Sequence, residues 1–351
     1  MAAKETHDRQ LRLGIVGLGR AFSLMLPTFL ADSRVELVAA CDPRAEARKR
    51  FSAEFQAPAC EGIESLARDP SVDAIYIASP HQFHAAHTRI AAAHGKHVLV
   101  EKPMALGVDE ARELGDIARR EGRILAVVHN FQFARSTLRL RKLMADGRLG
   151  EVQALWGSQL SNPRRRLPEW YESLPLGLFY DESPHFFYLV RALLGANPEI
   201  EVVHVVGGKD GRNTPAAITL LMRAGSIPAQ ISMNFVAPVS EWHLTVIGSR
   251  ALAVLDVFRD VLVVTRNDRE HLGRHILRTT ADVMTSHLSG VARSGALNVM
   301  GKLAYGNDVV IARFVEACRT RVPPKDIAAD DGLEVVKLQH EVLDRANLVA
   351  D

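Results

Sequence analysis

The chain has 351 residues, of which 47 % are apolar, and a formal net charge of +2 with a pI near 8.5. A chain of this length can bury a sizeable core and is expected to divide into two domains. Basic and acidic residues balance along most of the sequence, which argues against a nucleic-acid or membrane partner. No run approaches the ~20 apolar residues that a membrane span requires. The polar first ten residues do not resemble a signal peptide, so we expect a cytoplasmic protein.

The three cysteines, Cys41, Cys60 and Cys318, are odd in number and form no CxxC pair. This pattern is typical of buried thiols in a reducing compartment. It argues against a disulfide framework or a zinc ribbon.

Short apolar runs alternate with helical patterns in the first third of the chain. The expected strands are Leu11–Leu18, Val35–Cys41, Ala74–Ala78, Val98–Val100 and Ile124–Val128. Their lack of polar alternation is typical of strands that are covered on both faces. The expected helices between them are Ala21–Leu30, Arg44–Phe55, Gln82–His94 and Asp109–Arg120. Strand–helix alternation of this kind predicts an α/β fold with a doubly wound parallel sheet.

The pattern changes after residue 130. A helix over Leu138–Ala145 leads into strand candidates that often alternate apolar with polar residues and are joined by turns with glycine or proline. These candidates are Glu151–Leu160, Glu201–Val206, Ala216–Met222, Ala229–Phe235, His243–Ile247, Ala251–Phe258 and Val261–Thr265. They predict a mostly antiparallel open sheet with one face exposed or paired with another subunit. The tail is expected to be helical over residues 283–303, 308–319 and 331–347.

The turn after the first expected strand has the features of a nucleotide-binding loop. Gly17 permits a tight turn and Gly19 lets a pyrophosphate approach the start of a helix, although Phe22 replaces the third glycine of the fingerprint. Asp42 ends the second strand, where an acid hydrogen-bonds an adenosine ribose and repels a 2′-phosphate. The alternative for Asp42 is a helix N-cap, and Arg44 or Arg48 could instead reach a phosphate. The pattern predicts dinucleotide binding, with NAD favoured over NADP.

Two further segments follow strands of the same expected sheet. Ser79-Pro80-His81-Gln82-Phe83-His84 follows the third strand and Glu101-Lys102-Pro103 follows the fourth. Because the carboxyl ends of such strands form the ligand crevice, we expect these side chains at its rim. Lys102 can hold a substrate hydroxyl and stabilise a developing alkoxide, and Pro103 can carry a cis peptide bond. The alternative is a surface Glu-Lys pair. The nearby histidines lack metal-ligand spacing, so we expect no metal.

A third segment, Asp181-Glu-Ser-Pro-His185, pairs an acid with a base. Pro184 is expected in the first turn of the following helix, with Ser183 or Asp181 as its cap. A helix N-terminus disfavours a protonated imidazole, which suits His185 as a general base that Asp181 orients. The alternative is an ordinary capping aspartate beside a half-buried histidine.

Together these segments resemble the glucose–fructose oxidoreductase / inositol dehydrogenase family (Gfo/Idh/MocA). The resemblance also includes Gly147-Arg-Leu-Gly150-Glu-Val and Asp330-Asp331-Gly332-Leu333, and it covers nearly the whole chain. It implies a Rossmann domain over residues 1–130 and a substrate-binding and oligomerisation domain over residues 131–351. It also implies hydride transfer between NAD(P) and a ring hydroxyl or carbonyl, in a homodimer or homotetramer formed through the C-terminal sheet.

The resemblance assigns roles to residues by position. Lys102 would bind the reacting oxygen, His185 would move its proton, and Asp181 would hold substrate or His185. The expected cofactor-binding residues are Gly17, Gly19, Arg20, Ala21, Phe22, Asp42, Arg44, Ser79, Pro80, His81, His84, Glu101, Lys102, Pro103 and His129. The expected substrate-binding residues are Asn130, Arg164, Arg165, Arg166 and Tyr180.

Within the family, residues 19–22 and 178–185 resemble 4,5-dihydro-4,5-dihydroxyphthalate dehydrogenases. The cluster Arg164-Arg165-Arg166 supports a carboxylated substrate, because guanidinium groups suit carboxylates. The alternative is a solvated basic loop. We therefore expect a dehydrogenase that acts on a sugar, a polyol or a cyclic cis-dihydrodiol. The other hypothesis is a non-catalytic NAD-binding sensor, which would not need both Lys102 and His185.

Overall fold

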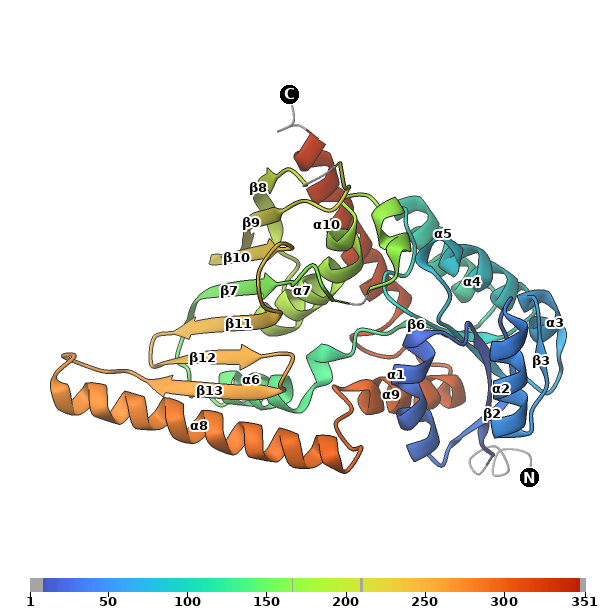
Figure 1. Cartoon of the computed structure of the whole chain (residues 1–351), viewed down its shortest axis with the longest axis horizontal. Coiled ribbons are helices and arrows are strands. Elements are labelled where there is room, and N and C mark those ends of the chain that lie inside the picture. Colours follow the sequence, from blue (N-terminus) through green and yellow to red (C-terminus); the bar gives the residue numbers. More distant parts are fainter. Residues whose placement is uncertain (1–8, 166, 209–210, 348–351) are drawn as a thin grey trace. The chain divides into compact units, whose positions relative to one another are not determined.

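The computed structural model describes residues 9–165, 167–208 and 211–347. The chain divides into two compact units (Figure 1). The first unit contains the residues up to Asn130 together with residues 307–337. The second contains residues 131–306 and the residues from Leu338 onward.

The first unit is built on a six-stranded sheet with the order β3-β2-β1-β4-β5-β6, in which every pairing is parallel. The strands are β1 (Leu11–Val16), β2 (Val35–Cys41), β3 (Ala59–Cys60), β4 (Ala74–Ile77), β5 (His97–Val100) and β6 (Leu125–Val127). The order reverses between β1 and β4, so the carboxyl ends of these two strands flank the switch point at which such sheets bind ligands.

Helices accompany this sheet because both of its faces are apolar. The residues of β4, for example, are all buried. The helices are α1 (Arg20–Ala31), α2 (Ala45–Phe55), α3 (Ile63–Arg68), α4 (His84–Ala93), α5 (Val108–Arg120) and α9 (Asn307–Thr320), with the 3₁₀ helix η1 (His81–Phe83) before α4. Helix α10 (Ala329–Asn347) begins in this unit. Residues 307–337 belong here because α9 packs on α1 and Ala328 forms a β-bridge with Ala126 of β6.

The second unit is built on a seven-stranded sheet with the order β13-β12-β11-β7-β10-β9-β8. The strands are β7 (Val152–Leu160), β8 (Glu199–Val206), β9 (Ala217–Ala224), β10 (Ile227–Asn234), β11 (Glu241–Gly248), β12 (Ala251–Asp256) and β13 (Val261–Arg266). All pairings are antiparallel except that between β7 and β10. Burial alternates along the strands, so one face is packed and the other carries exposed side chains such as Trp156.

Helix α7 (Leu178–Leu194) covers the packed face. A Cβ atom on Gly157 of β7 would lie 2.7 Å from the Phe186 ring, so only glycine allows this approach of helix to sheet. The other helices of the unit are α6 (Arg135–Ala145), α8 (Gly273–Val299) and the end of α10, with the 3₁₀ helices η2 (Phe131–Phe133) and η3 (Glu169–Ser173). Helix α8 runs along β13 at the edge of the sheet (Figure 1).

The fold class predicted from the sequence is confirmed. Two predictions of detail were wrong: β3 and α3 were missed, and α8 begins at Gly273 and ends at Val299 rather than spanning residues 283–303. The first error arose because a two-residue strand carries no periodic signal. Within the residues that the structure describes, no helix has the length and apolar character needed to cross a bilayer.

Candidate functional site

The turn between β1 and α1 leaves its backbone open to a ligand. Gly17 has φ +91°, and a Cβ atom there would lie 2.7 Å from the carbonyl oxygen of Ala78, so glycine is required. Gly19 caps α1 without a side-chain hydrogen bond, and a Cβ atom at this position would meet nothing within 4 Å. The start of α1 is therefore not covered at Gly19, which fits a binding site for the pyrophosphate of a dinucleotide.

Phe22 takes the place of the third glycine without closing this turn. Its side chain is buried, and its ring lies 6.2 Å from that of Phe51 on α2. The bulky residue thus packs between helices, while Arg20 and Ala21 in the same turn remain at least partly exposed.

Asp42 at the end of β2 is buried and accepts hydrogen bonds from its own chain. Its Oδ2 accepts from the Leu18 N–H at 2.8 Å and from Arg44 Nη2 at 2.9 Å, and its Oδ1 accepts from Arg44 Nε at 2.9 Å. Burial alone would raise the pKa of Asp42, but the bonds from Arg44 and Leu18 outweigh it and lower the pKa. The carboxylate is therefore ionised, and it holds the guanidinium that the sequence made a candidate for phosphate binding.

His84 connects the loops that follow β4 and β5. Its Nδ1 lies 2.7 Å from the carbonyl oxygen of Pro103, and its Nε2 lies 2.9 Å from that of Ser79. Burial lowers the pKa of His84 to about 3, so at neutral pH the ring carries one N–H and donates one of these bonds. His84 is fully buried, and its two contacts hold these loops together. Ser79 Oγ lies 3.0 Å from Nδ1 of His87, and His81 is also buried.

Lys102 directly follows β5, in a loop that is held by hydrogen bonds to the side chain of Glu101. Tyr76, fully buried on β4, donates a 2.7 Å hydrogen bond to Glu101 Oε1, and the Lys102 N–H contacts Glu101 Oε2 at 3.3 Å. The Lys102–Pro103 peptide bond is cis, as the sequence allowed. The side chain of Lys102 is half-buried. His129 and Asn130 follow β6 and are both buried.

His185 lies inside α7, and here the sequence-based expectation was wrong. Helix α7 begins at Leu178 after Gly177, so Pro184 is an interior residue rather than part of the first turn. An interior proline has no N–H for the carbonyl of the residue four positions earlier, here Tyr180. Gln339 on α10 supplies the missing donor, because its Nε2 lies 2.7 Å from the Tyr180 oxygen. His185 therefore lies in the third turn of α7. At this position the helix N-terminus no longer explains why His185 would stay unprotonated.

Aromatic rings from three elements surround His185. Its ring centroid lies 5.0 Å from that of Phe131 on η2, 5.3 Å from that of Trp242 on β11 and 5.6 Å from that of Tyr188 on α7. Its Nδ1 lies 2.8 Å from the Tyr188 hydroxyl, which also accepts a hydrogen bond from the Phe131 N–H at 3.1 Å. Tyr188 is buried, so this contact fixes the orientation of the imidazole.

A buried polar network lies beside this aromatic shell. Glu182, one turn before His185 on α7, accepts hydrogen bonds from Gln159 Nε2 and, at 2.9 Å, from Arg165 Nη1. Arg165 Nη1 also donates to Ser161 Oγ at 3.0 Å. Gln159 pairs with Trp242 across β7 and β11. Gln159 Oε1 and Trp242 Nε1 are buried and have no hydrogen-bond partner among the described residues.

The other predicted residues of this unit lie as follows. Asp181 is half-buried, four residues before His185 and therefore on the same side of α7. Tyr180 is fully buried, with its ring edge-on to that of His340. Arg164 is exposed, and Arg166 lies outside the described residues.

Sequence reasoning missed Tyr188, Trp242, Gln159 and Gln339. Tyr188 could have been found, because residues three apart on a helix are neighbours and it follows His185 by three. The other three reach the site only through the folding of the sheet and of α10, and no local pattern marks them.

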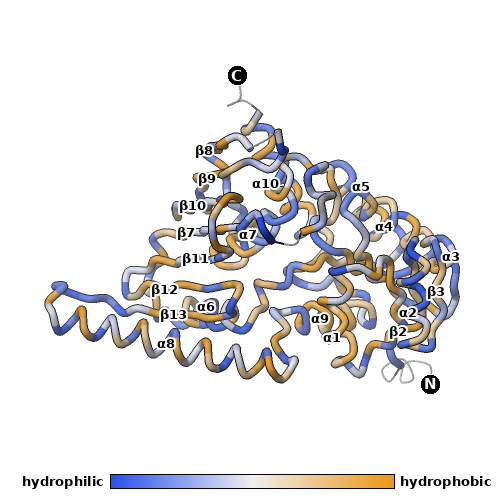
Figure 2. The backbone as a smooth tube through the Cα atoms, in the orientation of Figure 1, coloured by the Kyte–Doolittle hydropathy of each residue, from blue (hydrophilic) through white to orange (hydrophobic). Residues whose placement is uncertain are grey.

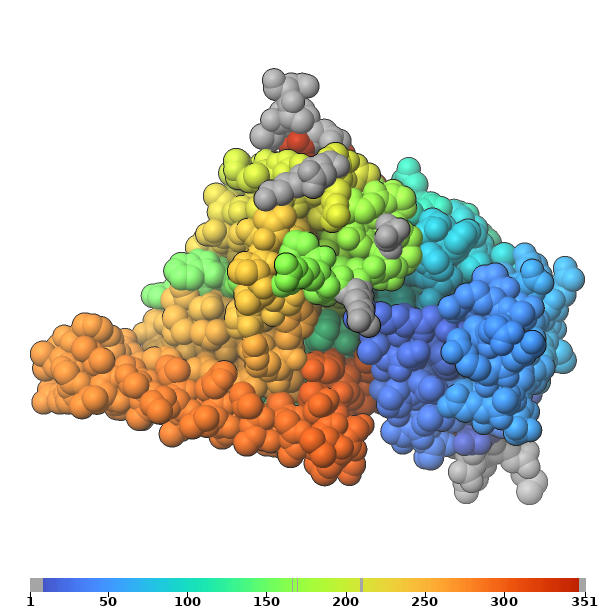
Figure 3. Space-filling model, in the orientation of Figure 1, coloured from blue at the N-terminus to red at the C-terminus, as the bar shows by residue number. Residues whose placement is uncertain are grey.

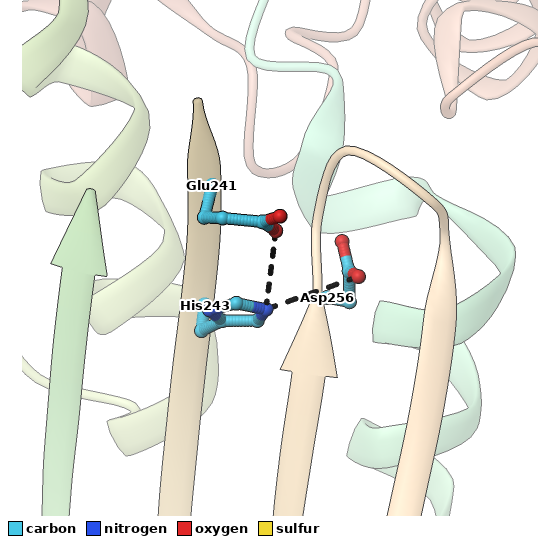
Figure 4. Close-up of side chains that lie close together, drawn as sticks. All are labelled: Glu241, His243 and Asp256. Atoms are coloured by element: carbon cyan, nitrogen blue, oxygen red, sulfur yellow. Dashed lines mark ion pairs between the residues drawn. The ribbon is translucent and has the colours of Figure 1, made fainter. Parts of the chain in front are cut away.

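One group in the described part of the chain has the residue types of a metal site. His243 Nε2 lies 3.7 Å from Glu241 Oε2 and 3.8 Å from Asp256 Oδ2 (Figure 4). Arg259 Nη1 contacts the same two carboxylates at 2.6 Å and 2.7 Å. A guanidinium thus already neutralises both acids, and we interpret the group as an ion-pair network. Glu241 and His243 alternate with buried Trp242, so they lie on the face of the sheet away from His185.

A parallel sheet in this order, with an open glycine turn at its switch point, defines a dinucleotide-binding Rossmann domain. The chain belongs to the oxidoreductase family with an NAD-binding Rossmann fold (GFO_IDH_MocA), whose model matches residues 11–129. The model of the GFO/IDH/MocA C-terminal domain matches residues 137–254. The family predicted from the sequence is therefore confirmed.

Curated relatives include several dehydrogenases and reductases. A 1-carboxy-3-chloro-3,4-dihydroxycyclohexa-1,5-diene dehydrogenase from Comamonas testosteroni is 39 % identical over 61 % of this chain and 55 % of that protein. A dTDP-3,4-didehydro-2,6-dideoxy-α-D-glucose 3-reductase from Streptomyces violaceoruber is 35 % identical over 54 % and 56 %. The chain thus matches little more than half the length of these two relatives. A trans-1,2-dihydrobenzene-1,2-diol dehydrogenase from Macaca fascicularis is 28 % identical over 70 % and 74 %.

Solved structures share the fold over almost the whole chain. A 3-ketoreductase from Actinomadura kijaniata in complex with NADP and TDP-benzene has a TM-score of 0.77 and 20 % identity, covering 95 % of this chain and 97 % of that one. GenD2 from gentamicin A biosynthesis, in complex with NAD, has a TM-score of 0.76 and 20 % identity, covering 96 % and 93 %.

Proposed function

We propose that the protein is an NAD-dependent dehydrogenase that oxidises a hydroxyl group on a carboxylated cyclic dihydrodiol. Three features support this: the open turn at Gly19 in an NAD-binding family, the ionisable groups Lys102 and His185, and the arginine beside the His185 shell. The relative from Comamonas testosteroni, which is named for a carboxylated dihydroxycyclohexadiene, supports the substrate class.

The proposed roles follow from the chemistry of alcohol oxidation. When bound, the nicotinamide supplies the acceptor for the hydride that leaves the ring carbon. Lys102 donates a hydrogen bond to the reacting oxygen and stabilises its developing negative charge. His185 takes the hydroxyl proton, with its ring held by Tyr188 and its surroundings kept dry by Phe131 and Trp242. Asp181 contacts the substrate or the His185 ring from the preceding turn.

The contacts of Arg165 are the main support for the proposed substrate class. Its bonds to Glu182 and Ser161 both use Nη1, and among the described residues nothing is bonded to the edge formed by Nε and Nη2. That edge has the fork geometry that binds a carboxylate with two parallel hydrogen bonds. Glu182 lies one turn before His185 on α7, so its contact holds Arg165 at the turn of α7 that precedes the proposed base.

NAD is the proposed cofactor because of Asp42. The ionised carboxylate ends β2, where the adenosine ribose binds in Rossmann domains, and it would repel a 2′-phosphate. It also engages Nε and Nη2 of Arg44, which are the atoms that would otherwise bind that phosphate.

The catalytic proposal is tested by following NADH formation with a panel of dihydrodiols, sugars and polyols. Lys102→Met and His185→Gln should each abolish turnover while binding of NAD stays measurable by calorimetry. Normal turnover in both variants would contradict the mechanism. Binding of NAD without turnover of any substrate by the wild type would favour the non-catalytic sensor instead.

The substrate class is tested separately with a carboxylated dihydrodiol and its uncharged analogue. Arg165→Gln should raise KM for the carboxylated substrate about 10–100-fold and hardly change that for the analogue, because a charge-assisted bidentate bond is lost. Arg164→Gln, on the same loop, is the matched control and should have little effect. Arg165→Lys keeps the charge but not the fork and should resemble Arg165→Gln. Equal effects on KM for both substrates would contradict the proposal that Arg165 binds the substrate carboxylate.

We also propose that the chain assembles through the exposed face of the seven-stranded sheet and works in the cytoplasm. Trp156, on the central strand β7, is 54 % exposed on that face, which is unusual for so large an apolar side chain. The three cysteines are free, as a reducing compartment would keep them.

A further inference from the structure

Helix α8 is attached to the sheet by polar contacts and by one close approach of its backbone. Asp282 forms an ion pair with Arg266 of β13 at 2.6 Å, and Ser294 donates a 3.0 Å hydrogen bond to the carbonyl oxygen of Asp260. Between them, Gly290 lies against Val261, where a Cβ atom would approach within 2.6 Å. Small and polar residues therefore attach this 27-residue helix to the body of the second unit.

The opposite side of α8 is apolar and open to solvent. Five large side chains on it are strongly exposed: Leu277 73 %, Met284 57 %, Leu288 64 %, Val291 41 % and Val299 88 %. Apolar residues recur along the whole helix in Figure 2, and Figure 3 shows it, in orange, as a ridge with one long side uncovered. A surface helix of a globular protein normally has one apolar stripe, which faces the core. Helix α8 already has apolar residues on its sheet side, where Ile276, Val283 and Leu297 recur at the seven-residue spacing of Gly290, so its outer apolar side is additional to what the sheet requires.

The spacing on this side is that of a helix–helix seam. We define the α8 stripe as Leu277, Ala281, Met284, Leu288, Val291, Gly295 and Val299. Successive members are separated by four, three, four, three, four and four residues, which is close to the alternation that keeps one stripe facing a partner helix. The small residues, Ala281 and Gly295, lie at equal distances from Leu288 and would let a partner approach closely.

We propose that the α8 stripe is an interface with the α8 stripe of a second copy of this chain, with the two helices antiparallel and Leu288 at the centre. In this register Leu277 packs on the partner's Val299, and Ala281 packs on the partner's Gly295. In these pairs a large residue opposes a large one and a small residue opposes a small one, while Met284 lies opposite the partner's Ala292, next to the partner's Val291. The antiparallel arrangement also places opposite helix-dipole ends together.

Area and charge both favour a second copy. Each exposed side chain of the stripe offers about 60–120 Å², so two copies would bury on the order of 1,000 Å² in all, which is where specific interfaces begin. No member of the stripe is charged, so two identical stripes meet without like-charge repulsion. A helix that lies on a membrane needs a cationic face opposite its apolar one, whereas that face of α8 is occupied by β13.

The first test is the mass of the full chain in solution, measured by analytical ultracentrifugation across micromolar concentrations. Leu288→Glu, alone and with Leu277→Glu, should halve the mass of the wild-type assembly. Leu24→Glu on α1 is the matched control, because Leu24 is also a 64 % exposed leucine, and it should leave the mass unchanged. Circular dichroism verifies folding. A wild-type monomer, or a variant with the wild-type mass, would overturn the proposal.

Cross-linking gives a second test that does not depend on a disruptive charge. Leu288→Cys treated with a short bis-maleimide should give covalent dimers, whereas Leu24→Cys should give none. A mixture of Leu277→Cys and Val299→Cys chains should cross-link more strongly than either chain alone. Failure of the Leu288→Cys cross-link would refute the seam. So would binding of the wild type to anionic phospholipid vesicles that Leu288→Glu abolishes, since the stripe would then serve a membrane surface.

Discussion

The contact between Gln339 and the Tyr180 carbonyl explains how α7 accommodates Pro184, and mutations can test this explanation. Gln339 is fully buried, and its Nε2 donates to the Tyr180 oxygen at 2.7 Å and to Ser183 Oγ at 3.2 Å. If this amide replaces the N–H that Pro184 lacks, then Gln339→Leu leaves a buried carbonyl without a donor. The expected loss is about 1–3 kcal/mol in the free energy of unfolding.

The decisive comparison is made in a Pro184→Ala background. Alanine restores the N–H four residues after Tyr180, so the carbonyl regains a partner within the helix. Gln339→Leu should then cost at least about 1 kcal/mol less than in the wild type, which is a coupling expected only of groups that share a partner. Pro184→Ala alone should not destabilise the protein, because interior proline disfavours a helix.

Tryptophan fluorescence during urea unfolding is the appropriate assay. Trp156, Trp170 and Trp242 are the only tryptophans of the chain, and all belong to the second unit, so the signal reports on the unit that contains the contact. Gln132→Leu is the control, because Gln132 is also a buried glutamine of this unit and its cost should not depend on residue 184. Equal costs of Gln339→Leu in both backgrounds would refute the reasoning.

Three further predictions concern the cofactor, the base and the ion-pair network. Asp42→Ala frees the Arg44 guanidinium and should shift the ratio of kcat/KM values for NADP and NAD toward NADP by about tenfold or more; Asp42→Ala with Arg44→Ala should lose that gain in the same steady-state assay. Tyr188→Phe removes the hydroxyl at His185 Nδ1 and should lower kcat about tenfold and alter its pH profile, with the dissociation constant of NAD unchanged. Burial alone would raise the pKa of Asp256, but bonds from His243 and Arg259 lower it from 3.8 to about 2. The stability that this carboxylate contributes is therefore present above pH 4 and is lost as the pH falls toward 2, so Asp256→Asn should cost about 1–2 kcal/mol at pH 7 and little at pH 2 in urea titrations.

The architecture was predictable where local pattern and global fold agree. A continuous apolar run such as Ala74–Ile77 can be buried only if both faces of the sheet are covered, and that requirement implies a parallel sheet with helices. The sequence did not predict which of the two units contains residues 307–337. Their helical periodicity shows that α9 has an apolar face, but it does not specify which sheet that face covers.

The candidate site was predictable only where a residue's chemistry depends on its own backbone. Gly17 is required by its positive φ, and the proline after Lys102 marks a strand end, so both could be inferred from type and position. The Pro184 prediction was wrong because the local rule, that proline belongs in a first turn, assumes no external donor. Gln339 is that donor, and it lies 155 residues further along the chain.

Glu182 clarifies what kind of recognition Arg165 can provide. An isolated arginine attracts any anion, but a buried glutamate on Nη1 cancels most of its long-range field. The remaining donors, Nε and Nη2 of Arg165, act at short range and bind well only when two oxygens lie in the plane of the guanidinium. Such a pair costs desolvation and gains selectivity, which is consistent with the proposal that Arg165 binds a ring carboxylate rather than a phosphate. The acid beside the proposed anion-binding arginine therefore supports, rather than opposes, its assignment to a carboxylated ring.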